Sequence, residues 1–429
     1  QAFDIVVVGA GMVGAALATG LGQNGFRVAM VDLAQAPAFD PASAPYIRVS
    51  ALSAGSERYL DSLGAWQKVL AMRATAYNRL AVWDNTHHPL SGLLPSDLAK
   101  VTFDAAGLGT SHLGHIVENS VTQQALWQTA TATAGLSVVA GHGVSTLSQT
   151  DQSVTLTLDN DQKLEAQLVI GTDGAQSRVR DMAGIGTSRN QYGQQAMVIS
   201  VRYQGAVEDI TWQSFYPSGP RAFLPLHSAA ADYPGECWAS LVWYDAPEEL
   251  ARLKSLTNEQ LMAEVQSAFP DELPTLTHIH SRASFPIARQ HAKTYFAGRI
   301  VLAGDAAHTI NPLAGQGVNL GFQDAKCLQE TLKEARRAGA DLADPYWLNQ
   351  YEQLRRPANR RMMMAMDAFY HLFSNRVPPV HLLRNLGLGV ASALPFARNR
   401  VARYAMGIDD ELPAIVKQLS QRLPGLKYL

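Results

Sequence analysis

The sequence predicts an α/β protein with an inserted antiparallel sheet and a helical C-terminal region, and three observations support this fold class. The first 32 residues alternate a strand, a glycine-rich turn, a helix and a second strand. Residues 194–245 contain successive strand-like segments, and residues from 346 onward have an almost wholly helical pattern. At 429 residues, 47% of them hydrophobic, the chain is long enough for two or three domains.

The N-terminal segment is predicted to be a Rossmann-like βαβ unit. Residues 3–8, FDIVVV, form a short apolar run rich in β-branched side chains, which is typical of a buried parallel strand. A glycine-rich turn at residues 9–14 follows directly, and residues 15–25 have helical spacing. A second strand over residues 27–31 ends at Asp32.

The central part of the chain mixes helices and strands. We expect an antiparallel sheet from the strand-like segments between 194 and 245, and a hairpin whose turn is Asp159-Asn160-Asp161. The other expected helices cover 51–72, 118–135 and 257–268, and the other expected strands cover 138–148, 152–158, 163–170 and 280–287.

Three domains follow from these elements. The first is expected to be discontinuous, with residues 1–75, 111–185 and 286–345. The second domain would combine residues 76–110 with 186–285, and it would carry the substrate. Residues 346–429 would form the C-terminal helical region.

The net charge and the cysteine content indicate which ligands and which cellular environment to expect. The net charge of −2 gives no reason to expect nucleic acid binding. Cys237 and Cys327 match no metal spacing or disulfide framework, so we expect no metal site and a reducing environment. The chain starts almost directly on a strand without a signal peptide, and it has no apolar run long enough to span a membrane. These features favour a cytoplasmic protein.

The first candidate site is the turn Gly9-x-Gly11-x-x-Gly14, with Met12 and Val13 between its last two glycines. In such a turn the first glycine allows the sharp bend, the second lets a pyrophosphate approach the backbone, and the third lets helix and strand pack closely. Asp32 ends the next strand, where a carboxylate accepts hydrogen bonds from ribose hydroxyls. The pattern favours dinucleotide binding, and the alternative is a tight strand–helix turn without a ligand.

Two further glycine-containing turns follow predicted strands. Residues 168–174 end in Asp173-Gly174, for which the alternative is an ordinary turn. Residues 304–321, GDAAHTINPLAGQGVNLG, begin with Gly304-Asp305 and lead into a predicted helix. Because a helix start carries about half a positive charge, this segment suits an anion or an electron-rich ring edge. The alternative is a helix start with no ligand.

Taken in this order and at these distances, the three turns resemble the group A flavoprotein monooxygenases, the aromatic hydroxylase family typified by para-hydroxybenzoate hydroxylase. The resemblance implies a Rossmann-like FAD-binding domain with FAD as cofactor, and NAD(P)H and O2 as co-substrates. It places Asp32 at the adenosine ribose, and Asp173-Gly174 near the pyrophosphate and the route of NAD(P)H. It also places Asp305 at the flavin-side ribose or ribityl chain, and Arg48 close to the flavin.

The same resemblance assigns the reacting edge of the flavin to the segment that follows Asp305. It implies a flavin C4a-hydroperoxide as the oxygenating species and no dedicated acid or base. His308 is then expected to have a structural role near the loop rather than to act as a general base. The flavin-edge loop with the catalytic role is Pro312, Gly315 and Gln316, and Gly317, Val318 and Asn319 complete the cofactor contacts.

The resemblance is closer to one branch, the bacterial hydroxylases of ubiquinone biosynthesis. It rests on residues 48–56, 113–127, 304–321 and 366–375. Within the branch, residues 211–226 and 238–245 look most like the member that adds the last ring hydroxyl to a polyprenyl benzoquinol. The loop 227–236 and the tail 409–429 depart from that pattern.

Several alternatives stay open at this point. A sister enzyme of the branch would hydroxylate an earlier polyprenylphenol. A flavin-dependent prenyl reductase would use the same fold, and a flavoprotein scaffold of a lipid-synthesis assembly would have no activity. A flavin halogenase is disfavoured because the sequence lacks a Trp-x-Trp-x-x-Pro signature.

The sequence also offers candidates for the substrate pocket and for a membrane-binding region. Phe223, Leu224 and Pro225, with Tyr244, are candidate walls of the substrate pocket, and the alternative for each is a place in the core. Residues 353–407 contain nine arginines and one acid, Asp367, among apolar side chains. This pattern favours a peripheral position on an anionic membrane, and a solvated basic face is the alternative. We also expect contact with other enzymes of ubiquinone biosynthesis.

Overall fold

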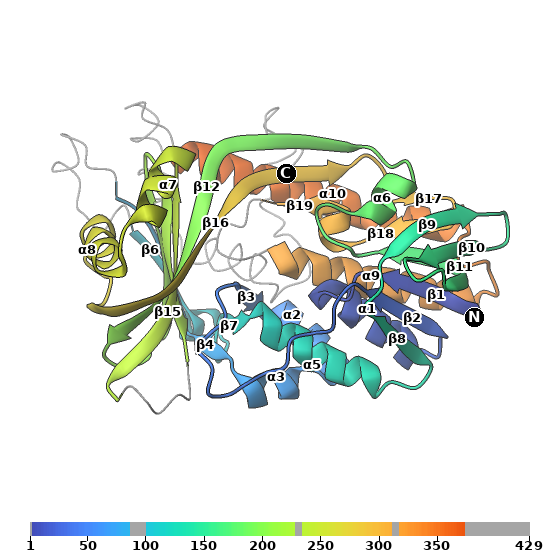
Figure 1. The fold of residues 1–429 in the computed structure, drawn as a ribbon, viewed down its shortest axis with the longest axis horizontal. Coiled ribbons are helices and arrows are strands. Elements are labelled where there is room, and N and C mark those ends of the chain that lie inside the picture. The colour runs from blue at the N-terminus through green and yellow to red at the C-terminus, as the bar shows by residue number, and fades with distance from the viewer. Residues whose placement is uncertain (1, 86–99, 228–233, 311–316, 374–429) are drawn as a thin grey trace.

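The computed structural model describes residues 2–85, 100–227, 234–310 and 317–373 of the chain. Two large sheets stand side by side, with a small sheet between them (Figure 1). The first sheet, at the N-terminal end of the molecule, carries the glycine-rich turns. The second carries the candidate substrate residues. The α/β prediction with an inserted sheet is therefore confirmed, and this sheet is antiparallel except for the parallel pairing of residues 79–84 with residues 210–216.

The first sheet has the strand order β17-β18-β11-β1-β2-β8. Its parallel members are β1 (Ala2–Val8), β2 (Val28–Asp32), β8 (Leu136–Ala140), β11 (Lys163–Gly171) and β18 (Ile300–Leu302). The antiparallel β10 (Val154–Leu158) pairs with the first residues of β11, and β9 (Val144–Gln149) pairs with β10. β18 pairs with the last residues of β11 on the same side, β17 (Phe296–Ala297) pairs with β18, and β8 forms the opposite edge. Parallel strands buried on both faces are apolar throughout, which is the reason that β1 was recognisable from sequence.

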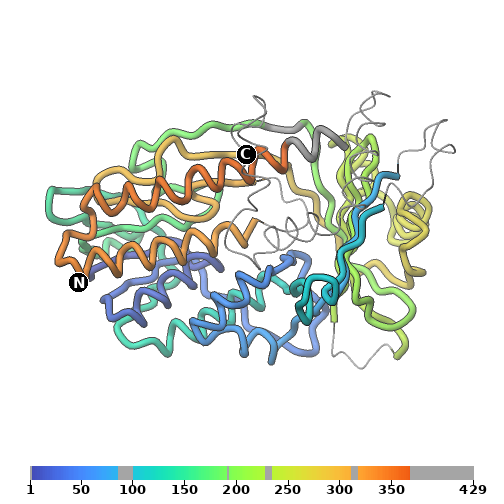
Figure 2. The backbone as a smooth tube through the Cα atoms, turned by 180° about the vertical axis from the view of Figure 1, so that it is seen from behind, coloured from blue at the N-terminus to red at the C-terminus, as the bar shows by residue number. Residues whose placement is uncertain are grey.

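Helices cover this sheet. α1 (Met12–Gln23), α5 (Asn119–Thr131) and α9 (Gly317–Arg337) pack near one another, and α10 (Pro345–Phe373) lies along α9. The tube in Figure 2 shows α9 and α10 running side by side. The short α6 (Arg178–Met182) follows the Asp173 turn, and α2 (Ala54–Ser62) and α3 (Trp66–Met72) lie near the small sheet.

The small sheet has the order β3-β7-β4, with β3 (Val49–Ser53), β7 (Gly114–Glu118) and β4 (Thr75–Tyr77). The prediction of one helix over 51–72 was wrong at its start, because residues 49–53 form β3 and the rest divide into α2 and α3. Ser53 caps α2 by accepting a hydrogen bond from the amide of Ser56. Gly64, with a φ of 77°, lies between the two helices and allows the break.

The second sheet has the order β19-β16-β12-β15-β14-β13-β5-β6. Its long central strands are β12 (Thr187–Gln204), β15 (Glu236–Asp245) and β16 (Leu276–Ala292), flanked by β14 (Gly219–Leu226) and β13 (Ile210–Tyr216). The edges are β19 (His308–Thr309), β5 (Arg79–Asp84) and β6 (Lys100–Asp104), and α4 (Ala105–Leu108) follows β6. The pairing of β5 with β13 brings residues 79–84 into the sheet that contains most of the 186–285 segment.

Two helices close the outer face of this sheet. α7 (Pro247–Ser255) and α8 (Asn258–Ala268) pack there through Leu250, Leu253, Leu261 and Val265. The helix predicted over 257–268 is confirmed as α8, and its capping box is formed by Thr257 and Gln260. β16 is longer than the predicted strand 280–287, and it runs back to the first sheet (Figure 1).

Candidate functional site

The N-terminal turn has two glycines required by the protein and one that faces open space. Gly9 has a φ of 98°, and a Cβ there would lie 2.5 Å from the carbonyl oxygen of Thr172. A Cβ on Gly14 would lie 1.8 Å from the carbonyl oxygen of Gly9, so β1 and α1 can meet only over a glycine. A Cβ on Gly11 would meet nothing within 4 Å. Packing therefore explains Gly9 and Gly14, but it does not explain Gly11.

The peptide between Gly9 and Gly11 is held by contacts on both sides. The amide of Ala10 donates to Oδ2 of Asp32 at 2.5 Å, and its carbonyl accepts from Trp127 Nε1 at 2.7 Å and from Gln123 Nε2 at 3.0 Å. Oδ1 of Asp32 accepts from the amide of Ala34 at 3.0 Å. The predicted ribose carboxylate therefore stands directly beside the glycine turn, at the carboxyl end of β2.

The Asp173 turn lies against the same glycines. Thr172 Oγ1 donates to the carbonyl of Gly9 at 2.7 Å. The carboxylate of Asp173 accepts from Ser177 Oγ at 2.5 Å and from the amide of Val179 at 3.1 Å, so it caps the start of α6. Gly174 has a φ of 83°, which suits glycine. The Asp173-Gly174 turn is therefore adjacent to the Gly9–Gly14 turn. The side chain of Asp173 has a structural function within its own turn.

The third stretch meets the first through Val13. A Cβ on Gly304, whose φ is 62°, would lie 3.2 Å from Val13 Cγ1, and a Cβ on Gly321 of α9 would lie 2.5 Å from Val13 Cγ2. The half-buried Val13 thus packs the first turn of α1 against two glycines of the 304–321 segment. Met12 is also half-buried in this region. These contacts bring all three predicted turns to one end of the first sheet.

Asp305 follows Gly304 and keeps a solvent-accessible side chain. The protein atoms around it still remove part of its hydration, and this desolvation raises the pKa of its carboxyl. The positive charges of His308 and Arg48 act in the opposite direction on that pKa. Arg48 is exposed, and its guanidinium lies over the ring of Phe285, 5.5 Å from the centroid. Arg48 thus stands between Asp305 and the second sheet.

The start of α9 is anchored by Asn319, whose side chain is buried. Its Oδ1 accepts from the amide of Ser53 at 3.0 Å and from Ser56 Oγ at 2.6 Å, and its Nδ2 donates to the carbonyl of Ala51 at 2.9 Å. The side chain therefore binds β3 and α2. Gly317 and Val318 are half-buried at the helix start, and Pro312, Gly315 and Gln316 lie outside the described residues.

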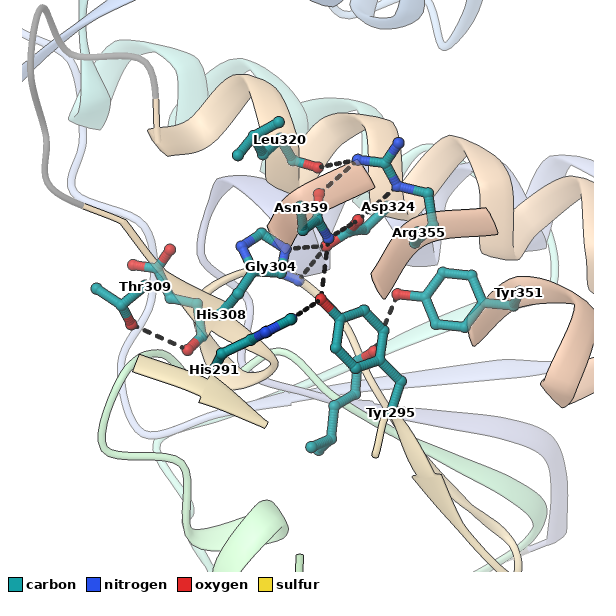
Figure 3. A network of polar contacts seen from close by, with 12 residues as sticks. His291, Tyr295, Gly304, His308, Thr309, Leu320, Asp324, Tyr351, Arg355 and Asn359 are labelled. Atoms are coloured by element: carbon teal, nitrogen blue, oxygen red, sulfur yellow. Dashed lines mark hydrogen bonds and ion pairs between the residues drawn. The ribbon is translucent and has the colours of Figure 1, made fainter. Parts of the chain in front are cut away.

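A buried polar network centred on Asp324 of α9 holds the turn that begins at Gly304 (Figure 3). Oδ2 of Asp324 accepts from the amide of Gly304 at 3.1 Å and contacts Nε2 of His308. Oδ1 accepts from Nε of Arg355 at 2.7 Å and from Nδ2 of Asn359 at 2.9 Å. The fully buried carboxylate therefore ties the turn to both α9 and α10.

The charges in this network decide the protonation of Asp324. Burial raises the pKa of the carboxyl, but the opposing effects of His308 and Arg355 outweigh it and hold the pKa well below its usual range. His308 is 2% exposed and engaged with Asp324, which agrees with a structural role rather than with a general base. The ring of Tyr295 stacks on the ring of His308, and their centroids are 6.2 Å apart.

The four candidate substrate residues do not share one surface. Phe223 is fully buried on the face toward α7 and α8, where it stacks on Trp212 with ring centroids 5.5 Å apart. Leu224 packs on the opposite face, in a cluster with Tyr77 of the small sheet. Successive side chains of a strand point to opposite faces, so residues 223–225 of β14 cannot all line one pocket. The structure places Phe223 in the core.

Tyr244 and Pro225 complete the set. Tyr244 of β15 is 3% exposed, and it belongs to a small cluster with Ala196 and Ile287, against which Met366 of α10 packs. Pro225 lies between Leu224 and Leu226 in β14 and is buried. Tyr244 and Leu224 therefore lie on the face toward the first sheet, although both are buried.

The sequence analysis missed one cluster of ionisable side chains. Glu57, His112 and His115 hold potential ligand atoms within 4.8 Å of one another, although no metal site was expected. His115 Nδ1 and His112 Nε2 each lie 2.7 Å from a different oxygen of Glu57, so hydrogen bonds already connect the three side chains. Sequence spacing could not reveal the cluster because 55 residues separate Glu57 from His112.

The arrangement fits a dinucleotide at the end of the first sheet. The space above Gly11, the start of α1 without a side-chain cap and the carboxylate of Asp32 at the next strand end are the features that a pyrophosphate and a ribose require. Asp305 and the start of α9 lie where the same ligand would continue toward the second sheet. The residues present therefore fit the chemistry of FAD.

Comparison with known proteins gives the following similarities. A family profile described as "FAD binding domain" matches residues 2–366. The chain is 42% identical over 408 residues to 3-demethoxyubiquinol 3-hydroxylase of Escherichia coli (strain K12), which covers 95% of this chain and 99% of that protein. It is 34% identical to ubiquinone hydroxylase UbiL of Rhodospirillum rubrum, over 94% of this chain and 89% of the relative. It is 32% identical to the mitochondrial ubiquinone biosynthesis monooxygenase COQ6 of Xenopus tropicalis, over 94% of this chain and 93% of the relative.

Solved structures share the fold at lower identity. The p-nitrophenol 4-monooxygenase PnpA of Pseudomonas putida DLL-E4 superposes with a TM-score of 0.74 at 20% identity, over 95% of this chain and 97% of that chain. PqsL of Pseudomonas aeruginosa, described as a probable FAD-dependent monooxygenase, gives a TM-score of 0.71 at 21% identity, over 90% of this chain and 99% of that chain.

Proposed function

Because the chain belongs to the FAD-dependent monooxygenases of the ubiquinone-biosynthesis branch, we propose that it hydroxylates the ring of a polyprenyl benzoquinol at the demethoxyubiquinol stage. The observation that carries this proposal is the 42% identity to the E. coli enzyme over nearly the full length of both chains. The local similarity that the sequence has to this member includes residues 211–226 and 238–245, which form β13, β14 and most of β15 in the second sheet.

The cofactor would be held by the turns that meet at the end of the first sheet. Gly9, Gly11 and the start of α1 would contact the pyrophosphate, and Asp32 would accept hydrogen bonds from the adenosine ribose. Asp305 would contact the flavin-side sugar chain. Bound FAD supplies the redox chemistry: NAD(P)H reduces it, and the reduced flavin activates O2 for transfer of one oxygen atom to an electron-rich ring carbon.

The protein itself would position the cofactor and keep water away from the reaction site. The backbone amides at the start of α9 would contact the flavin ring and would stabilise negative charge on it. The Asp324 network holds Gly304 and therefore Asp305 in place. The flavin-edge residues Pro312, Gly315 and Gln316 belong to the same proposal. The packing of the two sheets around the cofactor would exclude water from the reaction site.

Complementation tests the proposed substrate. The gene, placed in an E. coli strain that lacks 3-demethoxyubiquinol 3-hydroxylase, should restore ubiquinone and remove the accumulated demethoxy precursor, as measured by mass spectrometry of the quinone pool. A strain that lacks an earlier hydroxylase should not be restored. Rescue of the earlier step alone would favour a sister activity instead.

Purified protein tests the reaction type. It should be yellow with flavin absorbance, and it should consume O2 with formation of a hydroxylated product when NAD(P)H and quinol are both present. Anaerobic saturation of prenyl double bonds would favour the reductase. A flavoprotein that neither consumes O2 with the quinol nor reduces prenyl groups would favour a scaffold.

The second part of the proposal concerns location. We infer a peripheral position at the inner face of the cytoplasmic membrane, supported by the lipid-soluble tail of the proposed substrate and by the arginines of residues 353–407. In the described ranges no helix combines the length and apolarity needed to cross a bilayer. Arg355 is paired with Asp324 inside the protein, so the membrane surface would depend on the later arginines. Contact with other enzymes of the pathway belongs to the same proposal.

A further inference from the structure

Three acidic residues in the described part of the chain are buried, and they differ in the charge that balances them. Glu118 pairs with Arg73 at 2.6 Å, and Asp324 pairs with Arg355 at 2.7 Å. Glu57 of α2 is 7% exposed, but in the same ranges it is paired with two histidines and with neither arginine nor lysine. Buried carboxylates are paired with a cation or coordinate a metal ion. Glu57 therefore lacks the permanent positive charge that the other two have.

The two histidines and Glu57 bring ligand atoms from three segments together. Glu57 lies on α2, His115 lies on β7, and His112 lies between α4 and β7. Nδ1 of His115 and Nε2 of His112 face different oxygens of the Glu57 carboxylate, and the two imidazole rings meet edge to face with centroids 4.6 Å apart. Within the described ranges, no other three histidine, cysteine or acidic side chains have ligand atoms that all lie within 4.8 Å of one another.

The spacing of these atoms is close to that of a zinc site. Around a tetrahedral zinc ion with bonds of about 2.1 Å, neighbouring ligand atoms lie roughly 3.4 Å apart. The 2.7 Å between each imidazole nitrogen and its Glu57 oxygen would widen by roughly 0.7 Å when an ion replaced the shared hydrogen. Nδ1 of His112 lies 2.9 Å from Ser111 Oγ, a hydroxyl that can accept as well as donate. Nδ1 can therefore carry the proton and leave the lone pair of Nε2 for the metal.

The cluster is enclosed on one side and open to solvent on the other. The side chain of His115 is 11% exposed, and the ring of Trp66 packs edge-on against it with centroids 5.0 Å apart. The side chain of His112 is 26% exposed, so an ion can enter and a water molecule can bind from that side. The packing of Trp66 limits the motion of His115, which helps to hold a ligand in a fixed position.

We propose that Glu57, His112 and His115 bind one Zn²⁺ ion, with water as the fourth ligand. Two imidazoles and a carboxylate suit Zn²⁺, whereas Mg²⁺ and Ca²⁺ prefer oxygen ligands alone. The ion would supply the positive charge that Glu57 otherwise lacks, and it would join α2 to β7. Ser56, the residue before Glu57, donates to Asn319 at the start of α9 at 2.6 Å. The ion would therefore stabilise the part of α2 that holds this helix start.

Metal binding by the full-length protein tests the proposal. After treatment with EDTA and dialysis, the protein should bind one equivalent of Zn²⁺ in equilibrium dialysis, with a dissociation constant in the micromolar range or below. Co²⁺ in its place should give the visible absorbance of a four-coordinate cobalt site. Mg²⁺ and Ca²⁺ should not compete at the same concentration. Bound Zn²⁺ should raise the melting temperature, because the three ligands meet only in the folded protein.

Variants of the ligands locate the ion. His112→Ala removes one ligand from a partly exposed position, and Glu57→Gln removes the charged one. Each should weaken Zn²⁺ binding by about tenfold or more and abolish the rise in melting temperature. His142→Ala is the matched control, because His142 also lies 2.9 Å from a carboxylate, that of Asp159, but the pair has no third ligand. This variant should bind Zn²⁺ as wild type does.

Two outcomes would overturn the proposal. Wild-type protein that binds no Zn²⁺ would show that the three side chains form a hydrogen-bonded network only. Equal Zn²⁺ affinity in wild type, His112→Ala and Glu57→Gln would place the ion elsewhere on the chain. Melting of the EDTA-treated variants checks that they are folded before metal is added. None of these measurements uses a quinol, so their result is independent of the proposed function.

Discussion

Gly9, Gly11 and Gly14 belong to one sequence motif but meet different physical requirements. Gly9 and Gly14 are required by the close approach of β1, α1 and the Thr172 turn. Gly11 has a φ of −64° and no neighbour within reach of a Cβ, so the protein alone would accept alanine there. The motif by itself could not separate these roles, because close contacts become visible only in three dimensions.

We predict that Gly11→Ala and Gly14→Ala will act on different properties. Gly11→Ala should leave the stability of the FAD-free protein within about 0.5 kcal/mol of wild type. It should weaken FAD binding by about tenfold or more, because a methyl group would occupy the space predicted for the pyrophosphate. Thermal melting of the apoprotein and FAD titration measure the two effects.

Gly14→Ala is the contrasting variant. Its Cβ would meet the Gly9 carbonyl at 1.8 Å, so α1 must move and the apoprotein should lose more than about 2 kcal/mol of stability. Unchanged FAD affinity in Gly11→Ala would mean that this space does not hold the cofactor.

Helices α9 and α10 were recognisable from sequence, but their connection through Asp324 was not. The buried carboxylate accepts hydrogen bonds from Arg355, Asn359 and the Gly304 amide, which come from three separate segments. The sequence shows Asp324 only as one polar residue within an amphipathic helix. Only the packing of α10 on α9 makes it the anchor of the turn that carries Asp305.

We predict that Asp324→Asn will be strongly destabilising. The change removes the negative charge that balances the buried Arg355, so the free energy of unfolding should fall by about 3–5 kcal/mol. Asp209→Asn is the control, because Asp209 also pairs with an arginine, Arg79, but both side chains are exposed. Its loss should cost less than about 1 kcal/mol in urea unfolding. Similar losses in both variants would contradict the assignment of Asp324 as the buried anchor.

His291 of β16 lies beside this network, with 3.0 Å between its Nε2 and the hydroxyl oxygen of Tyr295, and it predicts a pH dependence of stability. Burial, with the positive charges of His308 and Arg356, lowers the pKa of His291 to about 4. The unfolded chain, with an ordinary histidine pKa of ~6.5, takes up a proton in the window between these values that the folded protein does not bind. The free energy of unfolding should therefore fall as the pH falls through that window.

His291→Gln tests this prediction. Urea unfolding of the variant from about pH 7 to about pH 4.5 should show a shallower loss of stability than in wild type. Asp324 contributes separately and at lower pH, because its folded pKa is held below the ordinary carboxyl value. An identical pH slope in variant and wild type would show that His291 titrates normally.

In the proposed function, the first sheet would hold the cofactor and the second sheet would hold the substrate. The first sheet gathers three turns that are more than a hundred residues apart in sequence, and the second sheet faces them through Arg48 and Phe285. The C-terminal region contributes α10 to this arrangement through Arg355 and Met366. Removal of everything after residue 352 would therefore damage the site itself, so a membrane test needs substitutions in the full-length chain.

We predict that Arg398→Glu, Arg400→Glu and Arg403→Glu, combined in the full-length chain, will reduce binding to anionic vesicles. Each arginine near such a surface contributes about 1 kcal/mol, so reversal of three charges should abolish flotation with phosphatidylserine-containing liposomes at low salt. Melting temperature and FAD content should stay unchanged, because the described network uses none of these residues. Equal flotation of variant and wild type would contradict the membrane part of the proposal.

The sequence by itself determined the features that depend on local backbone chemistry. The βαβ unit, the three glycine-containing turns, Asp32 at a strand end and the strand-rich second sheet were all readable, because glycine spacing and hydrophobic period reflect local geometry. The family resemblance added the cofactor and the class of reaction. The short strands β3, β4, β5 and β6 and the helix α7 were missed, since short segments carry little periodic signal.

Only the tertiary structure decided which side chains meet. Phe223 and Leu224 are neighbours in sequence, yet they face opposite sides of one sheet, and Ser200 and Ser240 are 40 residues apart but paired. Asp324, His308 and Arg355 form one buried network from a turn and two helices. Strand register, sheet order and helix packing set these contacts over long sequence separations, and they leave no local pattern by which the sequence alone could reveal them.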